Sequence, residues 1–198
     1  QQAAGGHRDA HQAADAQQVF DIAVATEADS FYHYSATPCL VQIGTSNGIY
    51  LIDPLALGGP SELAPLGPVF ASKKIRKIFH AAEYDLYVLK RDCSFEFENL
   101  FDTMVSAQLL GYPSVGLAAL AKRHFDVSLP KDEQRSDWSA RPLRENQLVY
   151  AAADVTYLVR MAEILNALLG AFDRDGGVSL LPFPPVELAE PGPSVPDP

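Results

Sequence analysis

Three acidic side chains and one tyrosine are the residues of this sequence best suited to shared chemistry. Glu27 lies near the end of an apolar run, VFDIAVATE, where an apolar residue would be the ordinary choice. Asp85 lies in HAAEYDLYVL, and Tyr150 and Asp154 lie in YAAADVTYL. Because residues four apart on a helix project from the same face, Tyr150 and Asp154 can serve one site.

This set of residues matches the needs of phosphodiester hydrolysis. Carboxylates bind Mg²⁺, and two such ions about 3.5–4 Å apart can activate a water and stabilise the leaving oxygen. A tyrosine hydroxyl beside them can orient the water or help to deprotonate it. Taken singly, Glu27 can instead be solvated at a strand edge, and Asp85 can favour a helix dipole. Tyr150 and Asp154 can likewise be a core tyrosine and a solvated acid.

The pattern around these residues predicts a sheet. Runs rich in β-branched residues at 19–27, 39–44 and 48–53 are bounded by Gly, Pro, Asn or polar residues, as adjacent strands are. The segments IRKIF at 75–79 and NLFD at 99–102 predict a fourth and a fifth strand. Side chains alternate along a strand, so the side chains at positions 25, 27 and 29 share one face of the first strand.

Helical patterns lie between and after these strands. The segment 61–71 predicts a helix with Ser61 as a possible N-cap, and 82–92 predicts a second helix. Asp102, at the end of the fifth strand, is most simply the N-cap of the next helix. Further helices are predicted at 103–111, at 115–125 and from about 144 to 169. This order of elements indicates an α/β domain with a mixed sheet, flanked by helices.

Composition narrows the classes of function. With 15 basic and 25 acidic residues the formal net charge is −10, which argues against a broad basic surface for nucleic acid, so that any such site must be local. Cys39 and Cys93 have no partner at zinc-ligand spacing, and we expect both to be reduced. No apolar stretch approaches the ~20 residues of a membrane helix, and a signal-peptide pattern is absent, which predicts a cytoplasmic protein without membrane contact.

The ends of the sequence differ from its middle. Residues 1–18 are rich in Ala, Gln and Gly, and residues 183–198 are rich in Pro, so both are predicted to be flexible tails. The predicted domain between them spans about 19–172.

Five segments of this domain, ATEADSFYHY, HAAEYDL, FDT, QRSDWSARPL and YAAADVTYL, together resemble the DEDD exonuclease superfamily. They are most similar to its tyrosine subclass and to RNase D, over about residues 19–169. The resemblance implies an RNase H-like exonuclease fold with a mixed five-stranded sheet. It also implies a 3′–5′ exoribonuclease that uses two Mg²⁺ or Mn²⁺ ions to release nucleoside 5′-monophosphates from a single-stranded RNA 3′ end. Glu27, Asp85 and Asp154 would be metal ligands, and Tyr150 would position the attacking water.

The first motif departs from the family. The family pattern is Asp-x-Glu, whereas this chain has Ala25, Thr26 and Glu27. Asp21 and Asp29 share the face of position 25 but lie about 13 Å away along an extended strand, so neither is an obvious substitute. We expect weaker metal binding and a misplaced water. Three interpretations stay open: a weakened or inactivated exoribonuclease, a noncatalytic RNA- or DNA-binding module on the same fold, or a 3′–5′ DNA exonuclease.

Contacts with the nucleic acid are predicted in the loop LPKDEQRSDWSARPL. Lys131, Arg135 and Arg141 can contact phosphates, and Trp138 can offer a flat stacking surface. The same loop can equally be a charged surface segment with a buried tryptophan. His80 follows a strand and can line the cleft, or it can be a structural histidine. A preference for RNA over DNA rests on the resemblance alone.

Overall fold

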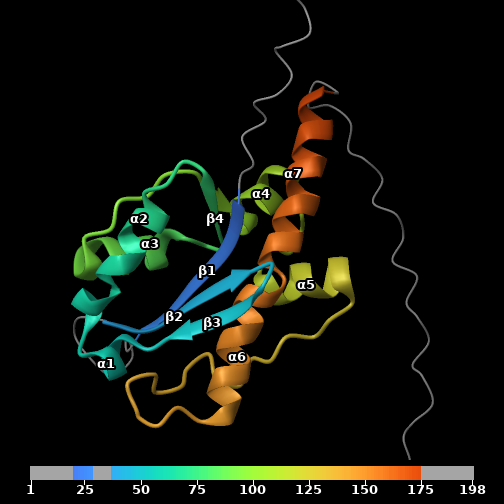
Figure 1. Cartoon of the computed structure of the whole chain (residues 1–198). Coiled ribbons are helices and arrows are strands. Elements are labelled where there is room, and N and C mark those ends of the chain that lie inside the picture. The colour runs from blue at the N-terminus through green and yellow to red at the C-terminus, as the bar shows by residue number, and fades with distance from the viewer. Residues whose placement is uncertain (1–19, 29–36, 175–198) are drawn as a thin grey trace, which may run out of the picture.

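A mixed five-stranded sheet forms the centre of the computed structural model, which describes residues 20–28 and 37–174. Its order is β3-β2-β1-β4-β5 (Figure 1). The strands are β1 (Phe20–Ala28), β2 (Pro38–Thr45), β3 (Gly48–Ile52), β4 (Ile75–Phe79) and β5 (Leu100–Asp102). The pairs β1–β2 and β2–β3 are antiparallel, and β1–β4 and β4–β5 are parallel, as the predicted mixed sheet requires. The predicted tails at 1–18 and 183–198, and Asp29, lie outside the described residues.

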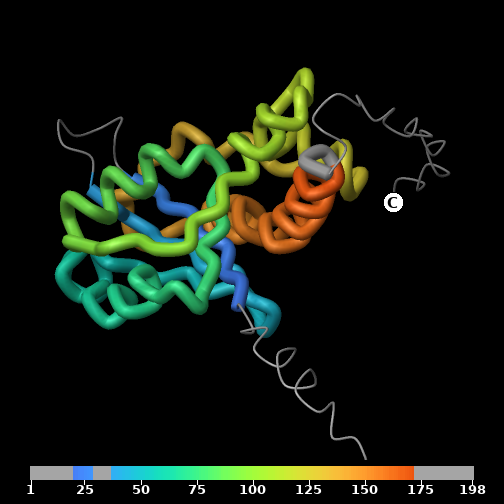
Figure 2. The backbone as a smooth tube through the Cα atoms, turned by 90° about the horizontal axis from the view of Figure 1, so that it is seen from above, coloured from blue at the N-terminus to red at the C-terminus, as the bar shows by residue number. Residues whose placement is uncertain are grey.

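Helices cover both faces of this sheet. They are α1 (Pro54–Leu57), the 3-10 helix η1 (Pro60–Leu66), α2 (Gly67–Phe70), α3 (Glu83–Cys93), α4 (Thr103–Leu109), α5 (Leu117–Phe125), α6 (Glu145–Thr156) and α7 (Leu158–Arg174). The view from above shows the yellow-green segment of α4 and α5 beside α7 (Figure 2). Ala107, Leu120, Met161 and Leu165 form the core shared by these three helices.

Alternation along β1 divides the main core into two layers. Ile22 and Val24 pack with Phe70 of α2 and Leu89 of α3 on one face. Ala23, on the other face, packs with Val155 of α6 and with Leu158 and Ala162 of α7. β1 is thus a central strand that is buried on both sides, as its nearly continuous apolar run indicates.

Two predicted helices differ in the structure. The segment 61–71 is not one helix capped by Ser61. Instead η1 begins after Gly59, so its N-cap residue has no side chain to cap it, and α2 follows η1. Pro65 lies inside η1 and Pro68 in the first turn of α2, and proline lacks the N–H that a continuous α-helix would need. The run predicted from about 144 to 169 is likewise divided into α6 and α7, and Tyr157 is the C-cap of α6.

Gly44 allows α6 to lie close against the sheet. A Cβ at this position would lie 3.1 Å from the carbonyl oxygen of Val155 and 3.3 Å from the Cβ of Ala23. A larger residue would therefore push α6 away from β2. The close approach brings the remaining residues of α6, Tyr150 and Asp154 among them, to the end of β1.

Within residues 20–28 and 37–174, no helix combines the length and the apolar character needed to cross a membrane.

Candidate active site

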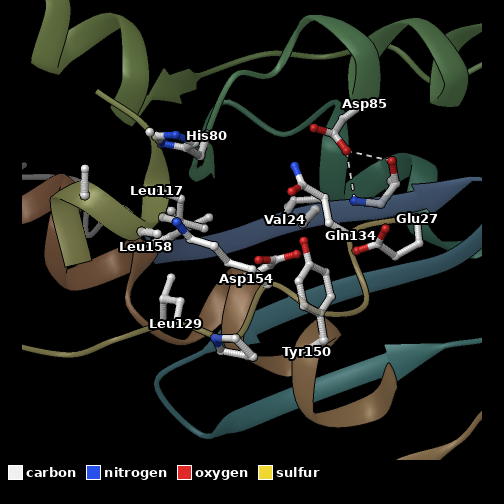
Figure 3. A pocket seen from close by; sticks show the side chains of 17 residues that line it. Val24, Glu27, His80, Asp85, Leu117, Leu129, Gln134, Tyr150, Asp154 and Leu158 are labelled. Carbon is white, nitrogen blue, oxygen red and sulfur yellow. Dashed lines mark hydrogen bonds between the residues drawn. The ribbon is translucent and has the colours of Figure 1, made fainter. Parts of the chain in front are cut away.

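One pocket brings together the four residues predicted to act as a set. Glu27, Asp85, Tyr150 and Asp154 all line a cavity of about 600 Å³ at the end of β1 (Figure 3). They come from β1, α3 and α6, which are far apart in the sequence. The mouth of the cavity is completed by the start of α5 and by the loop that precedes α6.

The alternation of β1 explains how two helices on opposite faces reach one cavity. Thr26 shares its face with Ile22 and Val24, which α3 covers, and Asp85 of α3 contacts it there. Glu27 shares the opposite face with Ala23, which α6 covers, and Asp154 of α6 lies beside it. The cavity therefore straddles the end of the strand.

Asp102 holds the turn that leads into α3. Its carboxylate caps α4 by accepting the N–H groups of Met104 and Val105 at 2.8 and 3.1 Å, which confirms the predicted N-cap. It also accepts the N–H groups of Ala81 and Ala82 at 3.2 and 2.8 Å. One side chain thus ties the start of α3 to the start of α4, and so fixes where Asp85 emerges.

Asp85 does more than favour the dipole of α3. Its Oδ1 accepts hydrogen bonds from the Thr26 N–H at 2.8 Å and from the Thr26 hydroxyl at 2.6 Å (Figure 3). Burial raises the pKa of Asp85 to about 6, although the two hydrogen bonds from Thr26 oppose the rise. The carboxylate is therefore held in place, but burial makes its ionised form unfavourable.

Glu27 and Asp154 form a partly buried carboxyl pair. Burial raises the pKa of Glu27, and the nearby charges of Asp154 and Asp85 raise it further. Burial also raises the pKa of Asp154, while its hydrogen bond with Glu27 lowers it. Two carboxylates this close cannot both ionise easily, so Glu27 keeps a proton at neutral pH in the absence of a cation.

Tyr150 lies beside this pair in the pocket (Figure 3). Burial raises the pKa of its hydroxyl, and the charges of Asp154 and Glu27 raise it further. The hydroxyl therefore stays protonated at neutral pH. The Trp138 ring packs behind it, with the two ring centroids 6.0 Å apart.

The hydrogen bonds of His80 define its tautomer. The Thr103 hydroxyl donates its single hydrogen to the carbonyl oxygen of Phe79 at 3.0 Å. The contact of 2.9 Å between that hydroxyl and His80 Nδ1 therefore requires Nδ1 to be the donor. Burial lowers the pKa of His80, which favours the neutral ring. A neutral ring protonated on Nδ1 has Nε2 as a hydrogen-bond acceptor, on a residue that lines the pocket.

The predicted nucleic-acid contacts have different outcomes. His80 and Lys131 line the pocket, whereas the exposed Arg135 is not among its lining residues. The prediction of Trp138 as a stacking surface is wrong, because the side chain is only 2% exposed and packs with Cys39 and Leu40. An indole in the core cannot receive a base.

Arg141 is a structural residue of the same loop. It pairs with both carboxylate oxygens of Asp53, at 2.7 and 2.8 Å. It also donates to the carbonyl oxygens of Trp138 and Cys39. These bonds fasten the loop to β2 and α1. The guanidinium is therefore not available to a phosphate, contrary to the prediction.

Two polar residues of the pocket were not predicted as site residues by the sequence analysis. Thr26 lies on the strand face that was not considered, although alternation with α3 on that side would have identified it. Gln134 lines the pocket from the loop before α6, and nothing in the pattern of that loop separates it from its exposed neighbours.

The donor set fits divalent cations only in part. Among the described residues, no group of three or more His, Cys, Asp or Glu side chains is arranged to hold a metal ion. The chemistry of the pocket nevertheless favours a cation, because burial raises the pKa of all three carboxyls and charge repulsion raises those of Glu27 and Asp85 further. A positive ion would relieve that repulsion. Asp21, paired with Arg76, contributes nothing here, as expected from its distance along the strand.

An RNase H-like sheet whose first strand ends in an acidic pocket defines a class of nuclease domains. Residues 8–170 match the family model described as 3′–5′ exonuclease, and the chain belongs to that family. Within the family it is similar to ribonuclease D. Ribonuclease D from Jannaschia sp. is 40% identical over 158 residues, which are 77% of this chain and 40% of that protein. The chain therefore spans less than half the length of this relative.

Solved structures agree with this assignment. Escherichia coli RNase D, described as an exoribonuclease involved in structured RNA processing, has a TM-score of 0.72 and 34% identity, over 79% of this chain and 41% of that chain. Brucella melitensis NrnC bound to pGG has a TM-score of 0.67 and 30% identity, over 82% and 78% of the two chains. NrnC with bound Mg²⁺ has a TM-score of 0.65 and 29% identity, over 83% and 79%.

Proposed function

We propose that this chain is a 3′–5′ exoribonuclease domain in which Ala25 weakens catalysis. The observation that carries the proposal is the convergence of Glu27, Asp85, Tyr150 and Asp154 on one pocket at the end of β1. The terminal nucleotide of a single-stranded RNA would enter this pocket. Its last phosphodiester would be hydrolysed to release a nucleoside 5′-monophosphate.

Two Mg²⁺ or Mn²⁺ ions would be held by the three carboxylates. Glu27 and Asp154, which already interact, would share one ion, and Asp85 would serve the other. When bound, such ions lower the pKa of water and stabilise the leaving oxygen. Ala25 removes a carboxylate from this set and no acid among the described residues replaces it, which is why we expect weak activity.

The other pocket residues would orient the substrate. Tyr150 keeps its proton, so it would position the attacking water by donating a hydrogen bond rather than by acting as a strong base. His80 Nε2 would accept a hydrogen bond from a ribose hydroxyl. Lys131, the one lysine or arginine among the residues described as lining the pocket, would contact a phosphate and supply local positive charge in a chain whose net charge is −10.

The test compares three proteins on a 5′-labelled single-stranded RNA with Mg²⁺ or Mn²⁺: this chain, Ala25→Asp, and Ala25→Asp combined with Asp154→Asn. We expect a ladder of 3′-shortened products with Ala25→Asp, little with this chain and none with the double variant. A DNA of the same sequence, run in parallel, distinguishes an RNA enzyme from a DNA exonuclease. Retained RNA binding without a ladder from any protein would instead establish a noncatalytic binding module.

A further inference from the structure

Gln42, in the middle of β2, is a buried amide without a partner. Its side chain is 0% exposed, and neither its nitrogen nor its oxygen has a hydrogen-bond partner among the described residues. Buried polar side chains are nearly always paired, and an unpaired one destabilises the fold. The presence of an unpaired amide at position 42 therefore needs an explanation, which we sought among the residues around it.

The neighbours of Gln42 on its face of the sheet are apolar. Ala25 of β1 and Leu51 of β3 lie directly across from it. Residues paired across strands project to the same face, close enough for their side chains to touch. Two positions along β2 in either direction are Leu40, which packs with Ala151, and Gly44, which lies under Val155. The face is closed by α6.

Position 25 differs from the other neighbours in one respect. Ala25 also lines the pocket, whereas Leu40, Gly44 and Leu51 do not. A polar group at position 25 would thus be wetted on one side and would touch the Gln42 amide on the other. The remaining neighbours offer no such place, because a polar group there would itself be buried.

We propose that Gln42 is a positioning residue for a carboxylate at position 25. Its amide N–H donates to one oxygen of that carboxylate and leaves the other oxygen facing Glu27 and Asp154 in the pocket. In this chain Ala25 leaves the amide without an acceptor. The importance of the contact for catalysis rests on the proposed exonuclease function, but the contact itself does not.

A double-mutant cycle on the full chain, without metal or RNA, tests the contact. The four proteins are this chain, Gln42→Met, Ala25→Asp and the combination, and the measurement is the midpoint of thermal unfolding at pH 7.5. Methionine has nearly the length of glutamine and no amide. Beside Ala25, Gln42→Met should leave the midpoint unchanged or raise it by about 2–4 °C, because it removes an unpaired group. Beside Ala25→Asp, it should lower the midpoint by about 2–4 °C.

The reversal of sign is the diagnostic result. Gln108→Met, at an exposed position of α4, serves as the control and should shift the midpoint by less than about 1 °C in both backgrounds. A shift of the same sign and size in both backgrounds would show that Gln42 only fills space, and would overturn the proposal. If Ala25→Asp does not fold, Ala25→Asn must show the reversal, and failure of both to fold also overturns it.

A second measurement reports on positioning rather than packing. Calorimetric Mn²⁺ binding should be about tenfold weaker in the combined variant than in Ala25→Asp, as is usual for loss of a group that orients a ligand. In the Ala25 background, Gln42→Met should leave Mn²⁺ binding unchanged. Equal Mn²⁺ affinity with and without Gln42 beside Ala25→Asp contradicts a positioning role. A sign reversal without any RNA cleavage would leave the Gln42 contact standing and refute the exonuclease function.

Discussion

Replacing Asp85 with asparagine should make the metal-free chain more stable at neutral pH. Burial raises the pKa of Asp85 from 3.8 to about 6, so the folded state holds the proton more tightly than the unfolded state does. The stability from this protonation is complete below pH 3.8 and is lost as the pH rises through about 6. One pKa unit corresponds to about 1.4 kcal/mol, so the ionised carboxylate costs about 3 kcal/mol at pH 7.5.

Asparagine removes the charge and can keep both hydrogen bonds from Thr26, because its side-chain oxygen can accept them. We therefore expect Asp85→Asn to raise the free energy of unfolding by about 1–3 kcal/mol at pH 7.5 and by almost nothing at pH 4. Urea denaturation in EDTA measures it, with the fluorescence of buried Trp138, the single tryptophan, as the probe.

The matched control is Asp126→Asn, because Asp126 is also an aspartate beside a helix end but its side chain is 66% exposed. Its effect should stay within about 0.5 kcal/mol at both pH values. If Asp85→Asn destabilises the chain at pH 7.5, or changes stability equally at both pH values, the partly buried carboxylate does not destabilise the fold as we infer.

Three further predictions concern the supports of the pocket, each measured by urea denaturation followed by circular dichroism. Asp102→Ala should cost about 2–4 kcal/mol, and Asp102→Ser, which keeps the cap of α4 but is too short for the turn before α3, should cost less; equal losses would exclude the second role. Trp138→Ala should cost about 3–5 kcal/mol, as a core residue would, whereas unchanged stability with lost RNA binding would restore the stacking hypothesis. Gly44→Ala should cost about 1–3 kcal/mol through the clash with Val155, and unchanged stability would show that α6 can retreat freely.

The sequence predicted the sheet, and the shared helix face of Tyr150 and Asp154, because both depend on local pattern. Each strand of the structure overlaps a segment that was predicted to be a strand, and Tyr150 and Asp154 share a helix face as their spacing requires. Asp102 could be identified as a cap since capping is a property of neighbouring residues. These features need little knowledge of the rest of the fold.

The features that the sequence could not predict depend on distant partners. Trp138 could equally be a surface or a core residue until β2 and α6 were seen to enclose it. Arg141 looked like a phosphate ligand because Asp53, its partner, is 88 residues away in sequence. The second role of Asp102, and the unpaired amide of Gln42, likewise depend on contacts across the sheet.

The position of the pocket explains why, under the proposed function, an alanine at position 25 would be enough to weaken it. The last residues of β1 alternate between the α3 face and the α6 face, so Thr26 fixes Asp85 from one side while Glu27 meets Asp154 on the other. Position 25 also lies on the α6 face, two residues before Glu27. There it lines the cavity and is paired across the strands with the buried Gln42. An alanine there leaves the strand and the core intact, because it fits among Ala23, Val155 and Leu158. The fold therefore persists with an alanine at position 25, and under the proposed function a carboxylate there would complete the acidic cluster.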